Sequence, residues 1–434
     1  MAIATPSATA SRPFGQRYAF VVVAVIFVCL LVSSALRAAP GVLFEPLESA
    51  FGWSRDTVSA SAALGILVYG LTGPFAAALM ERLGLRRTVI GALALMAGST
   101  GLSLLMTAPW QLMATWGLMS GVGTGAVAAV LGATVANRWF KTNRGLVMGL
   151  MSASTATGNL VFLPAMAALA ESGGWRSVVT AVAIGSAVLI PLVILLVPER
   201  PASIGIGRFG AEPDEVVPPA RAAGSGFIAE TFGILAKAAG TRTFWLLFST
   251  FFICGLTTNG LVGTHLIAYC GDHGIPEVAA AGLLATMGVF DLIGTTFSGW
   301  LTDRFDPRKL LLAYYGFRGL SLLYLPYSGF SGWTLTAFAV LYGLDWIATV
   351  PPTAKLANEA FGDREGPIVF GWVLAGHQVG GASAAFIAGY IRQSQGDYAT
   401  AFFLAGLTGL LAAALSMMIN RGARSPATPV PQAA

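Results

Sequence analysis

Long apolar runs separated by short polar segments make up most of this chain. A helix needs about 20 apolar residues to cross the hydrocarbon core of a bilayer. Backbone groups in lipid must be satisfied within a helix or a closed barrel, and these runs lack the alternation typical of barrel strands, so they predict transmembrane helices. The predicted spans are residues 18–39, 57–80, 87–107, 110–136, 144–168, 177–198, 242–269, 277–302, 308–329, 333–356, 366–390 and 398–420.

The longest polar stretch separates these twelve predicted spans into two sets of six. Residues 199–241 are rich in Pro and Gly and carry charges of both signs, as is typical of a linker. The sequence therefore predicts an all-α membrane protein with one six-helix bundle at residues 18–198 and a second at residues 242–420. Small and polar residues fill positions 1–17, and Pro and Ala are frequent at 421–434, which indicates disordered tails.

The overall composition agrees with a membrane protein and sets its orientation. The chain has 55% hydrophobic residues, 10% charged residues and a mean hydropathy of +0.72, far from the values of a soluble globular protein. Most loop bases fall on one side of the predicted membrane, and only Arg55, Arg176 and Arg392 fall on the other. The positive-inside rule then places both termini in the cytoplasm. The net charge of +5 reflects this orientation and does not indicate a nucleic-acid partner.

The sequence offers no motif for catalysis, a cofactor or a metal. Cys29 and Cys254 lie inside predicted spans and Cys270 lies near a helix end, so the three cysteines form neither a disulfide framework nor a metal-binding spacing. A phosphate-binding loop of the GxxxxGK type is absent, which argues against transport driven by ATP. We therefore do not expect an enzyme, a cofactor or a bound metal.

One charged loop occurs twice. Residues 81–87 read ERLGLRR after the second predicted span, and residues 303–309 read DRFDPRK after the eighth, in the same order of acid, base, turn and double base. The repeat indicates two related halves. Without further information these charges would be solvated anchors at the cytoplasmic surface. The residues concerned are Glu81, Arg82, Arg86, Arg87, Asp303, Arg304 and Arg308.

The repeated loop, the two sets of six spans and the central linker resemble the major facilitator superfamily. Residues 136–158, ANRWFKTNRGLVMGLMSASTATG, and the run PERPASIGIGRFG after the sixth span are similar to its monocarboxylate transporter and oxalate/formate antiporter branch. The resemblance implies a major facilitator fold of two pseudo-symmetric bundles, a monomer, alternating access to one central site, and a cytoplasmic latch made by the repeated loops. In the animal members of the branch the acid of the eighth helix is followed four residues later by arginine, whereas here Asp291 is followed by Thr295.

Three charged residues lie deep within predicted spans. A lone carboxylate at the depth of Asp291 costs several kcal/mol unless it is protonated or paired, so it is a candidate for proton coupling. Arg318 in the ninth span could pair with Asp291 or with Asp345 in the tenth, and the sequence does not choose between a coupling role and a static ion pair. Pro351 and Pro352 interrupt helical hydrogen bonding in the tenth span, which would supply a gating hinge.

A second set of polar residues is predicted to bind substrate. Arg37 resembles the basic residue that the monocarboxylate branch carries in its first helix, and an arginine fork can bind a carboxylate through two hydrogen bonds. The alternative is that Arg37 extends to the outer membrane surface. A histidine such as His377 can titrate near neutral pH or act as a structural donor. The further candidates on helices expected to line the cavity are Tyr69, Asn159, Asn259, His265 and Gln378.

These observations favour a secondary active transporter of a small organic anion. The hypothesis is that a monocarboxylate moves by alternating access, either with a proton or in exchange for another anion. One alternative is a proton-driven exporter of amphipathic or cationic compounds, in which the buried acids bind the cargo. Another is a transporter-like sensor that binds a ligand and signals through a partner.

Overall fold

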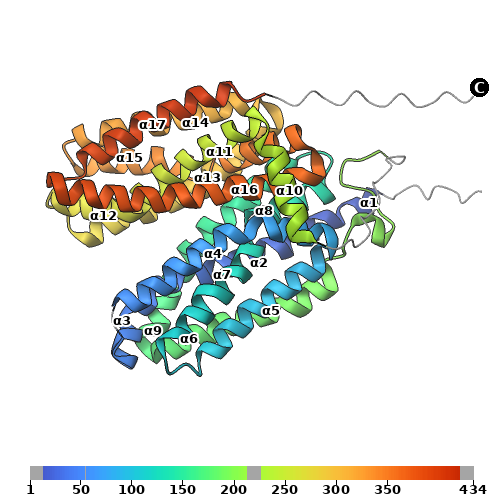
Figure 1. Cartoon of the computed structure of the whole chain (residues 1–434), viewed down its shortest axis with the longest axis horizontal. Coiled ribbons are helices and arrows are strands. Elements are labelled where there is room, and N and C mark those ends of the chain that lie inside the picture. The colour runs from blue at the N-terminus through green and yellow to red at the C-terminus, as the bar shows by residue number, and fades with distance from the viewer. Residues whose placement is uncertain (1–12, 54, 213–225, 421–434) are drawn as a thin grey trace, which may run out of the picture. The chain divides into compact units, whose positions relative to one another are not determined.

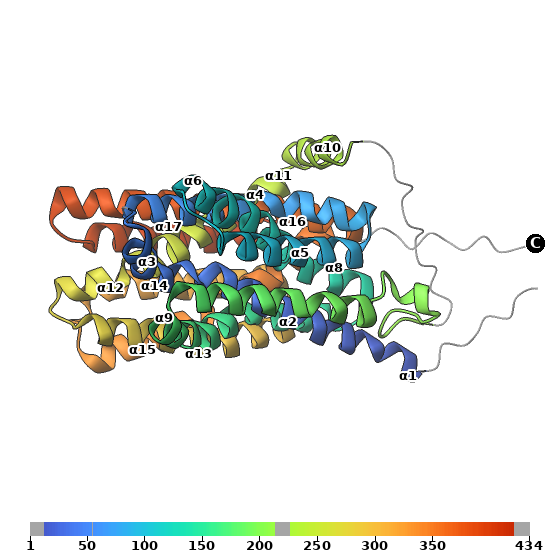
Figure 2. The same cartoon turned by 90° about the horizontal axis from the view of Figure 1, so that it is seen from below.

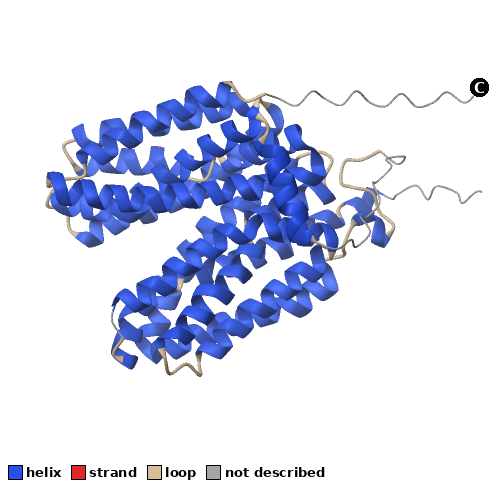
Figure 3. Ribbon diagram, viewed as in Figure 1, coloured by secondary structure: helices blue, strands red, loops and turns tan. Residues whose placement is uncertain are grey.

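The computed structural model describes residues 13–53, 55–212 and 226–420, and these residues are almost entirely helical (Figure 3). The only extended pairing within them is a single bridge between Phe140 and Phe209. The chain divides into two compact units. Apart from residues 73–75, the first unit runs to Phe227 and the second begins at Ile228, so the division falls within the predicted linker.

The first unit is built from helices that follow the predicted apolar runs. Residues 13–16, which were predicted to belong to the N-terminal tail, form a short helix. The helices are α1 (Pro13–Gln16), α2 (Tyr18–Ala38), α3 (Pro40–Phe51), α4 (Arg55–Arg82), α5 (Leu85–Ser103), α6 (Pro109–Leu112), η1 (Met113–Met119), α7 (Ser120–Ala126), α8 (Ala129–Trp139) and α9 (Arg144–Leu196) (Figure 1).

The longest helix of this unit, α9, covers two predicted spans. Gly174, with φ of +66°, is the one residue within it whose backbone is not helical. Glycine adopts this left-handed φ without the steric cost that other residues meet. The chain therefore bends at Gly174, between the predicted spans 144–168 and 177–198. Buried apolar residues such as Ile26 of α2, Leu93 of α5 and Val193 of α9 form the core between these helices.

The second unit repeats this architecture. In α16, Gly362 has φ of +81° and separates the predicted spans 333–356 and 366–390 in the same way. The helices are η2 (Pro201–Ile204) before the unit, then α10 (Phe227–Ala239), α11 (Arg242–Gly255), η3 (Leu256–Val262), α12 (Gly263–Asp272), α13 (Glu277–Arg304), α14 (Pro307–Tyr324), η4 (Leu325–Tyr327), α15 (Gly332–Asp345), α16 (Val350–Gln395) and α17 (Ala399–Met417). Counting adjoining helices as one, eight continuous segments of the described chain are long and apolar enough to cross a membrane.

The predicted linker contains ordered structure at both ends. Phe209 pairs with the end of α8 through two backbone hydrogen bonds. Its N–H donates to the Trp139 carbonyl at 2.8 Å, and its carbonyl accepts from the backbone N–H of Lys141 at 2.9 Å. At the other end, α10 lies across the long helices of its own unit (Figures 1 and 2). An ion pair of 2.9 Å between Lys237 and Glu365 connects α10 to α16.

Glycines bring α13 and α15 unusually close together. A Cβ atom added to Gly294 of α13 would overlap the backbone carbonyl of Leu344, and one added to Gly343 of α15 would lie 2.6 Å from the Met287 carbonyl. Small residues at a helix crossing allow backbones to approach in this way. The close crossing places Asp291 of α13 beside the C-terminal end of α15, where the candidate site begins.

Candidate functional site

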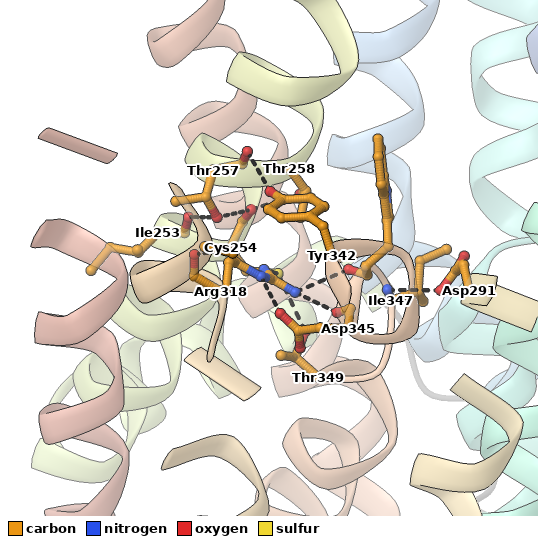
Figure 4. Close-up of polar contacts among 12 residues, drawn as sticks. Ile253, Cys254, Thr257, Thr258, Asp291, Arg318, Tyr342, Asp345, Ile347 and Thr349 are labelled. Carbon is orange, nitrogen blue, oxygen red and sulfur yellow. Dashed lines mark hydrogen bonds and ion pairs between the residues drawn. The ribbon is translucent and has the colours of Figure 1, made fainter. Parts of the chain in front are cut away.

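A buried ion pair between α14 and α15 forms the centre of the polar cluster in the second unit (Figure 4). Nε of Arg318 lies 2.6 Å from Oδ2 of Asp345, and the side chains are 0% and 7% exposed. Nη1 of Arg318 also donates to the Cys254 thiol on α11 at 2.9 Å. Of the two acids that could have paired with Arg318, the structure therefore selects Asp345.

Arg318 also binds the backbone where the tenth predicted span is interrupted. The helical hydrogen bonding of α15 ends at Asp345 and that of α16 begins at Val350, directly before Pro351 and Pro352. The last carbonyls of a helix have no donor within it, and this applies to Asp345 and Trp346 at the end of α15. Pro351 and Pro352 in addition lack the N–H groups that would bond to the carbonyls of Ile347 and Ala348. Nη2 of Arg318 donates to the carbonyl of Asp345 at 2.6 Å and to that of Trp346 at 3.2 Å.

A serine from α13 supplies one more donor to the interruption. The hydroxyl of Ser298 donates to the Ala348 carbonyl at 2.5 Å, which is one of the carbonyls that the prolines leave without a helical partner. Side chains from α13 and α14 thus supply donors to the carbonyls of Trp346 and Ala348 in this segment. The predicted break in the helix is present, and side chains of neighbouring helices bind it; its role as a gating hinge stays a prediction.

Asp291 has a different environment from Asp345. Its Oδ1 accepts hydrogen bonds from the Thr295 hydroxyl at 2.7 Å and from the backbone N–H of Ile347 at 3.0 Å. The side chain is buried, and no lysine or arginine of the described chain forms an ion pair with it. The charges of Arg318 and Asp345 act on it without direct contact. One acid is therefore neutralised by arginine, while the other accepts hydrogen bonds from the neutral donors Thr295 and Ile347.

The first unit presents an arginine that has no acidic partner among the described residues. The guanidinium of Arg37 lies over the ring of Tyr69, 4.7 Å from its centroid. Tyr69 is 9% exposed, whereas the Arg37 side chain is exposed. Ring stacking leaves the edge of the guanidinium and its N–H donors available to an anion. This arrangement fits the predicted carboxylate anchor, with Tyr69 as its support.

His377 is accessible in part and has unused hydrogen-bonding capacity. Its ring packs against Phe251 with centroids 4.9 Å apart, and it lies close enough to Cys254 for an electrostatic interaction. Its Nδ1 is buried and has no hydrogen-bond partner within the described part of the chain. The neighbouring Gln378 is half-buried on the same helix. His377 thus remains a candidate for a donor to substrate.

The other predicted substrate residues have different surroundings. Nε2 of His265 lies 2.9 Å from the Ala385 carbonyl and Nδ1 lies 3.2 Å from the Tyr398 hydroxyl, so protein groups occupy both ring nitrogens. This arrangement favours a structural role for His265. Asn259 is exposed within η3. The side chain of Asn159 lies outside the described residues.

The repeated charged loops make ion pairs within each unit. Glu81 pairs with Arg138 of α8 at 2.6 Å. In the second unit Arg308 pairs with Asp306 at 2.7 Å. The guanidinium of Arg304 lies 4.0 Å from the centre of the Trp300 ring. The side chain of Arg86 is half-buried, that of Arg87 is exposed, and Arg82 and Asp303 make further contacts.

The two loops hold the same helix position in different ways. The backbone N–H of Arg308, at the start of α14, donates to the Asp306 carboxylate at 3.0 Å. The equivalent N–H of Arg86, at the start of α5, donates to Glu199 at 3.0 Å. Gly84 occupies the position of Asp306, and its φ of +100° and lack of a Cβ let the Glu199 carboxylate approach. Both helices thus receive an acid at the N-terminus, where the helix dipole favours it.

Comparison with known proteins identifies the family of this chain. The profile described as Major Facilitator Superfamily matches residues 26–353 and 272–434, well over half of the sequence. The chain belongs to the major facilitator superfamily. It is accordingly a multi-pass membrane protein of a transporter family, as the repeated loops and the two sets of predicted spans indicated.

Relatives within the major facilitator superfamily support the predicted branch. The chain is 29% identical to the rat protein named monocarboxylate transporter 13, over 89% of this chain and 85% of the relative. It is 24% identical to a Pseudomonas putida protein named gallate transporter, over 96% and 95%. A solved structure of the proton:xylose symporter XylE matches with a TM-score of 0.69 at 15% identity, covering 94% of this chain and 97% of the symporter. At that identity the structural match shows the fold alone.

Several residues of this superfamily member enter the buried cluster without having been predicted. Cys254, Thr295 and Ser298 are small or weakly polar, and such residues are common in membrane helices as packing groups. The hydroxyl of Tyr342 donates to the Thr257 carbonyl at 2.8 Å beside the same cluster. The four-residue spacing of Asp291 and Thr295 on one helix face was the one signal in the sequence that pointed to such a contact. Among the described residues no group of three or more His, Cys, Asp or Glu side chains could hold a metal ion.

Proposed function

We propose that this protein is a secondary active transporter of a small organic anion, most simply a monocarboxylate. The observation that carries the proposal is Arg37, an exposed guanidinium supported by Tyr69 and without an acidic partner among the described residues. Arg37 lies in the last turn of α2 with its N–H donors free of an acidic partner among the described residues, so an anionic ligand could use them. Arg37 would bind the substrate carboxylate through paired N–H donors.

Asp291 is the residue that we assign to proton coupling. Its carboxyl group is buried, and within the described part of the chain it accepts hydrogen bonds from the Thr295 hydroxyl and the Ile347 N–H. Asp345, by contrast, neutralises Arg318 and would remain charged through a transport cycle. A proton taken up by Asp291 would therefore accompany the anion, or anion exchange would proceed with Asp291 unchanged. His377, whose side chain is half-buried, is the candidate second donor to the substrate.

The names of the relatives agree with an acid as substrate, since they include monocarboxylate and gallate transporters. In this proposal the repeated loops act as a cytoplasmic latch, with Glu81 and Arg138 forming one of its ion pairs. Both termini lie in the cytoplasm, as the distribution of loop bases predicts. The protein acts as a monomer in a membrane of the bacterial inner type.

The test of the anion site is uptake by purified protein in liposomes. The panel contains lactate, pyruvate, formate, oxalate and larger aromatic acids, each with and without an inward proton gradient. Arg37→Ala should abolish uptake of the transported acid and weaken its binding at least tenfold, because a charged hydrogen bond contributes about 1.5–3 kcal/mol. Arg176→Ala is a matched control, since that exposed guanidinium also lies 4.7 Å from an aromatic ring, here Trp175. Equal effects of the two variants would contradict the assignment.

Asp291→Asn tests the coupling site in the same liposomes. The variant should lose accumulation driven by the proton gradient and retain counterflow, because exchange of bound anion does not require release of the proton. A cation exporter would behave differently: it would depend on the acids and would be indifferent to Arg37→Ala. Unimpaired gradient-driven uptake by Asp291→Asn would rule out this residue as the proton carrier.

A further inference from the structure

Arg318 does more than neutralise Asp345. Its guanidinium donates to the Asp345 carboxylate, to the Cys254 thiol and to two backbone carbonyls of the interruption that separates α15 from α16. The side chain is completely buried. These four acceptors, on α11, α15 and residue 346, fix the orientation of the planar Arg318 guanidinium. The guanidinium in turn holds the two backbone carbonyls in place.

The interrupted segment also touches Asp291. Ile347 lies directly after the two residues whose carbonyls Arg318 binds, and its N–H donates to Asp291 at 3.0 Å. An N–H in a continuous helix would be used by the carbonyl one turn earlier. Here it points to a side chain because residues 346–349 are not in regular helical hydrogen bonding. The position of this donor depends on the carbonyls that Arg318 and Ser298 hold.

We propose that Arg318 is a positioning residue for Asp291: by holding the carbonyls of Asp345 and Trp346, it aims the Ile347 N–H at the Asp291 carboxylate. This inference rests on the proposed function of Asp291 in proton coupling. A hydrogen bond to a charged carboxylate is roughly twice as strong as one to a neutral carboxyl group. Protonation of Asp291 therefore weakens the contact with Ile347 and loosens the interruption between α15 and α16. Proton loading and the geometry of the hinge are linked through one backbone N–H.

The charged groups that face Asp291 come from both neighbouring helices. Arg318 of α14 and Asp345 of α15 interact with it through space, while Thr295 of its own helix donates to the same Oδ1. Arg318→Lys keeps the positive charge but has a single ammonium group in place of a planar fork. A lysine would preserve the charge balance and lose the simultaneous hold on Asp345 and the two carbonyls. This substitution separates positioning from charge.

The first measurement needs no substrate. Hydrogen exchange in the full-length protein in micelles should become at least tenfold faster at Ile347 in Arg318→Lys and in Asp291→Asn, with little change elsewhere in the second unit. Subtracting the Asp291→Asn spectrum at acidic pH isolates the infrared carbonyl band of protonated Asp291. This band should move to higher wavenumber in Arg318→Lys, because the hydrogen bond from the Ile347 N–H is lost. Cys254→Ser, which leaves the carbonyl contacts of Arg318 intact, should change neither signal.

The second measurement is transport. Arg318→Lys should retain counterflow, while its gradient-driven accumulation should fall at least tenfold. In the double variant with Asp291→Asn the two losses should not add, because both substitutions act through the same contact. Unchanged exchange at Ile347 and an unchanged carbonyl band in Arg318→Lys would overturn the inference, as would faster exchange throughout the unit. If Arg318→Lys does not fold, Ser298→Ala frees the Ala348 carbonyl of the same segment and should shift both signals in the same direction. Absence of transport in the parent protein would refute the proposed function. The hydrogen-exchange and infrared results would still test whether Arg318 positions the Ile347 N–H against Asp291.

Discussion

The buried pair of Arg318 and Asp345 makes a quantitative prediction about stability. Asp345→Asn preserves the side-chain shape, and the amide nitrogen can replace Oδ1, which accepts no hydrogen bond from the described residues. The variant therefore mainly removes charge and leaves the Arg318 guanidinium buried without a counter-ion. Breaking a buried pair from one side costs about 3–5 kcal/mol. For a domain of this size that corresponds to a fall in melting temperature of roughly 6–20 °C.

An exposed pair in the same unit provides the matched control. Asp272 lies 2.7 Å from Arg392, and the side chains are 24% and 38% exposed, against 7% and 0% for Asp345 and Arg318. Because water screens such a pair, Asp272→Asn should leave the melting temperature within about 4 °C of the parent. Thermal unfolding of the purified proteins in one detergent, followed by intrinsic fluorescence, measures both. Equal shifts in the two variants would refute the reasoning from burial.

A second substitution sharpens this prediction. In many proteins a buried ion pair can be replaced by two apolar residues with little loss of stability. Here Asp345→Leu combined with Arg318→Met should not recover stability, because the carbonyls of Asp345 and Trp346 would lose their donor as well. Full recovery in the double variant would show that Arg318 serves only the carboxylate.

Three further predictions concern the surrounding structure. Gly294→Ala should lower the free energy of unfolding by about 1–3 kcal/mol, since the new methyl group overlaps the Leu344 carbonyl. Gly316→Ala, where a methyl group meets open space, should not, and thermal unfolding distinguishes the two variants. Asp306→Ala and Glu199→Ala should each cost about 1 kcal/mol, because each removes the acid at a helix N-terminus, and an unaltered melting temperature would contradict this. Glu81→Gln should change the maximal transport rate several-fold at unchanged substrate affinity if the loop pair is a latch; altered affinity alone would exclude that role.

The helices were predictable because membrane helices are defined by apolar length. Each predicted span coincides with helical structure, and the residues that divide the long helices α9 and α16, Gly174 and Gly362, lie in the predicted gaps. The short helix α10 was not predicted. Its sequence, residues 227–239, follows a stretch rich in Pro and Gly, and the composition of the whole linker obscured a 13-residue amphipathic segment. Because the composition was averaged over the whole linker, the short helix within it was missed.

The site was predictable in its residues and not in its pairings. Asp291, Arg318 and Asp345 were identified because charge within an apolar span is costly. The choice of partner for Arg318 depends on how α13, α14 and α15 are rotated about their axes. Hydropathy predicts how deep a residue lies in the membrane, but not which neighbouring helix its side chain faces. The close approach at Gly294 and Gly343 sets that rotation. The same limit applies to His265, whose contacts with Tyr398 and Ala385 come from two other helices.

The two ways of capping the repeated loops imply a different order of events during synthesis. In the second unit, Asp306 lies two residues before the N–H that it binds, so the start of α14 is complete as soon as it emerges from the ribosome. In the first unit, the corresponding acid, Glu199, lies 113 residues after Arg86, beyond the end of α9. The start of α5 therefore waits for its own span and three further predicted spans to be made and inserted. A nascent chain halted before Glu199 would carry an uncapped first loop, while a chain halted just after the second loop would already have its cap.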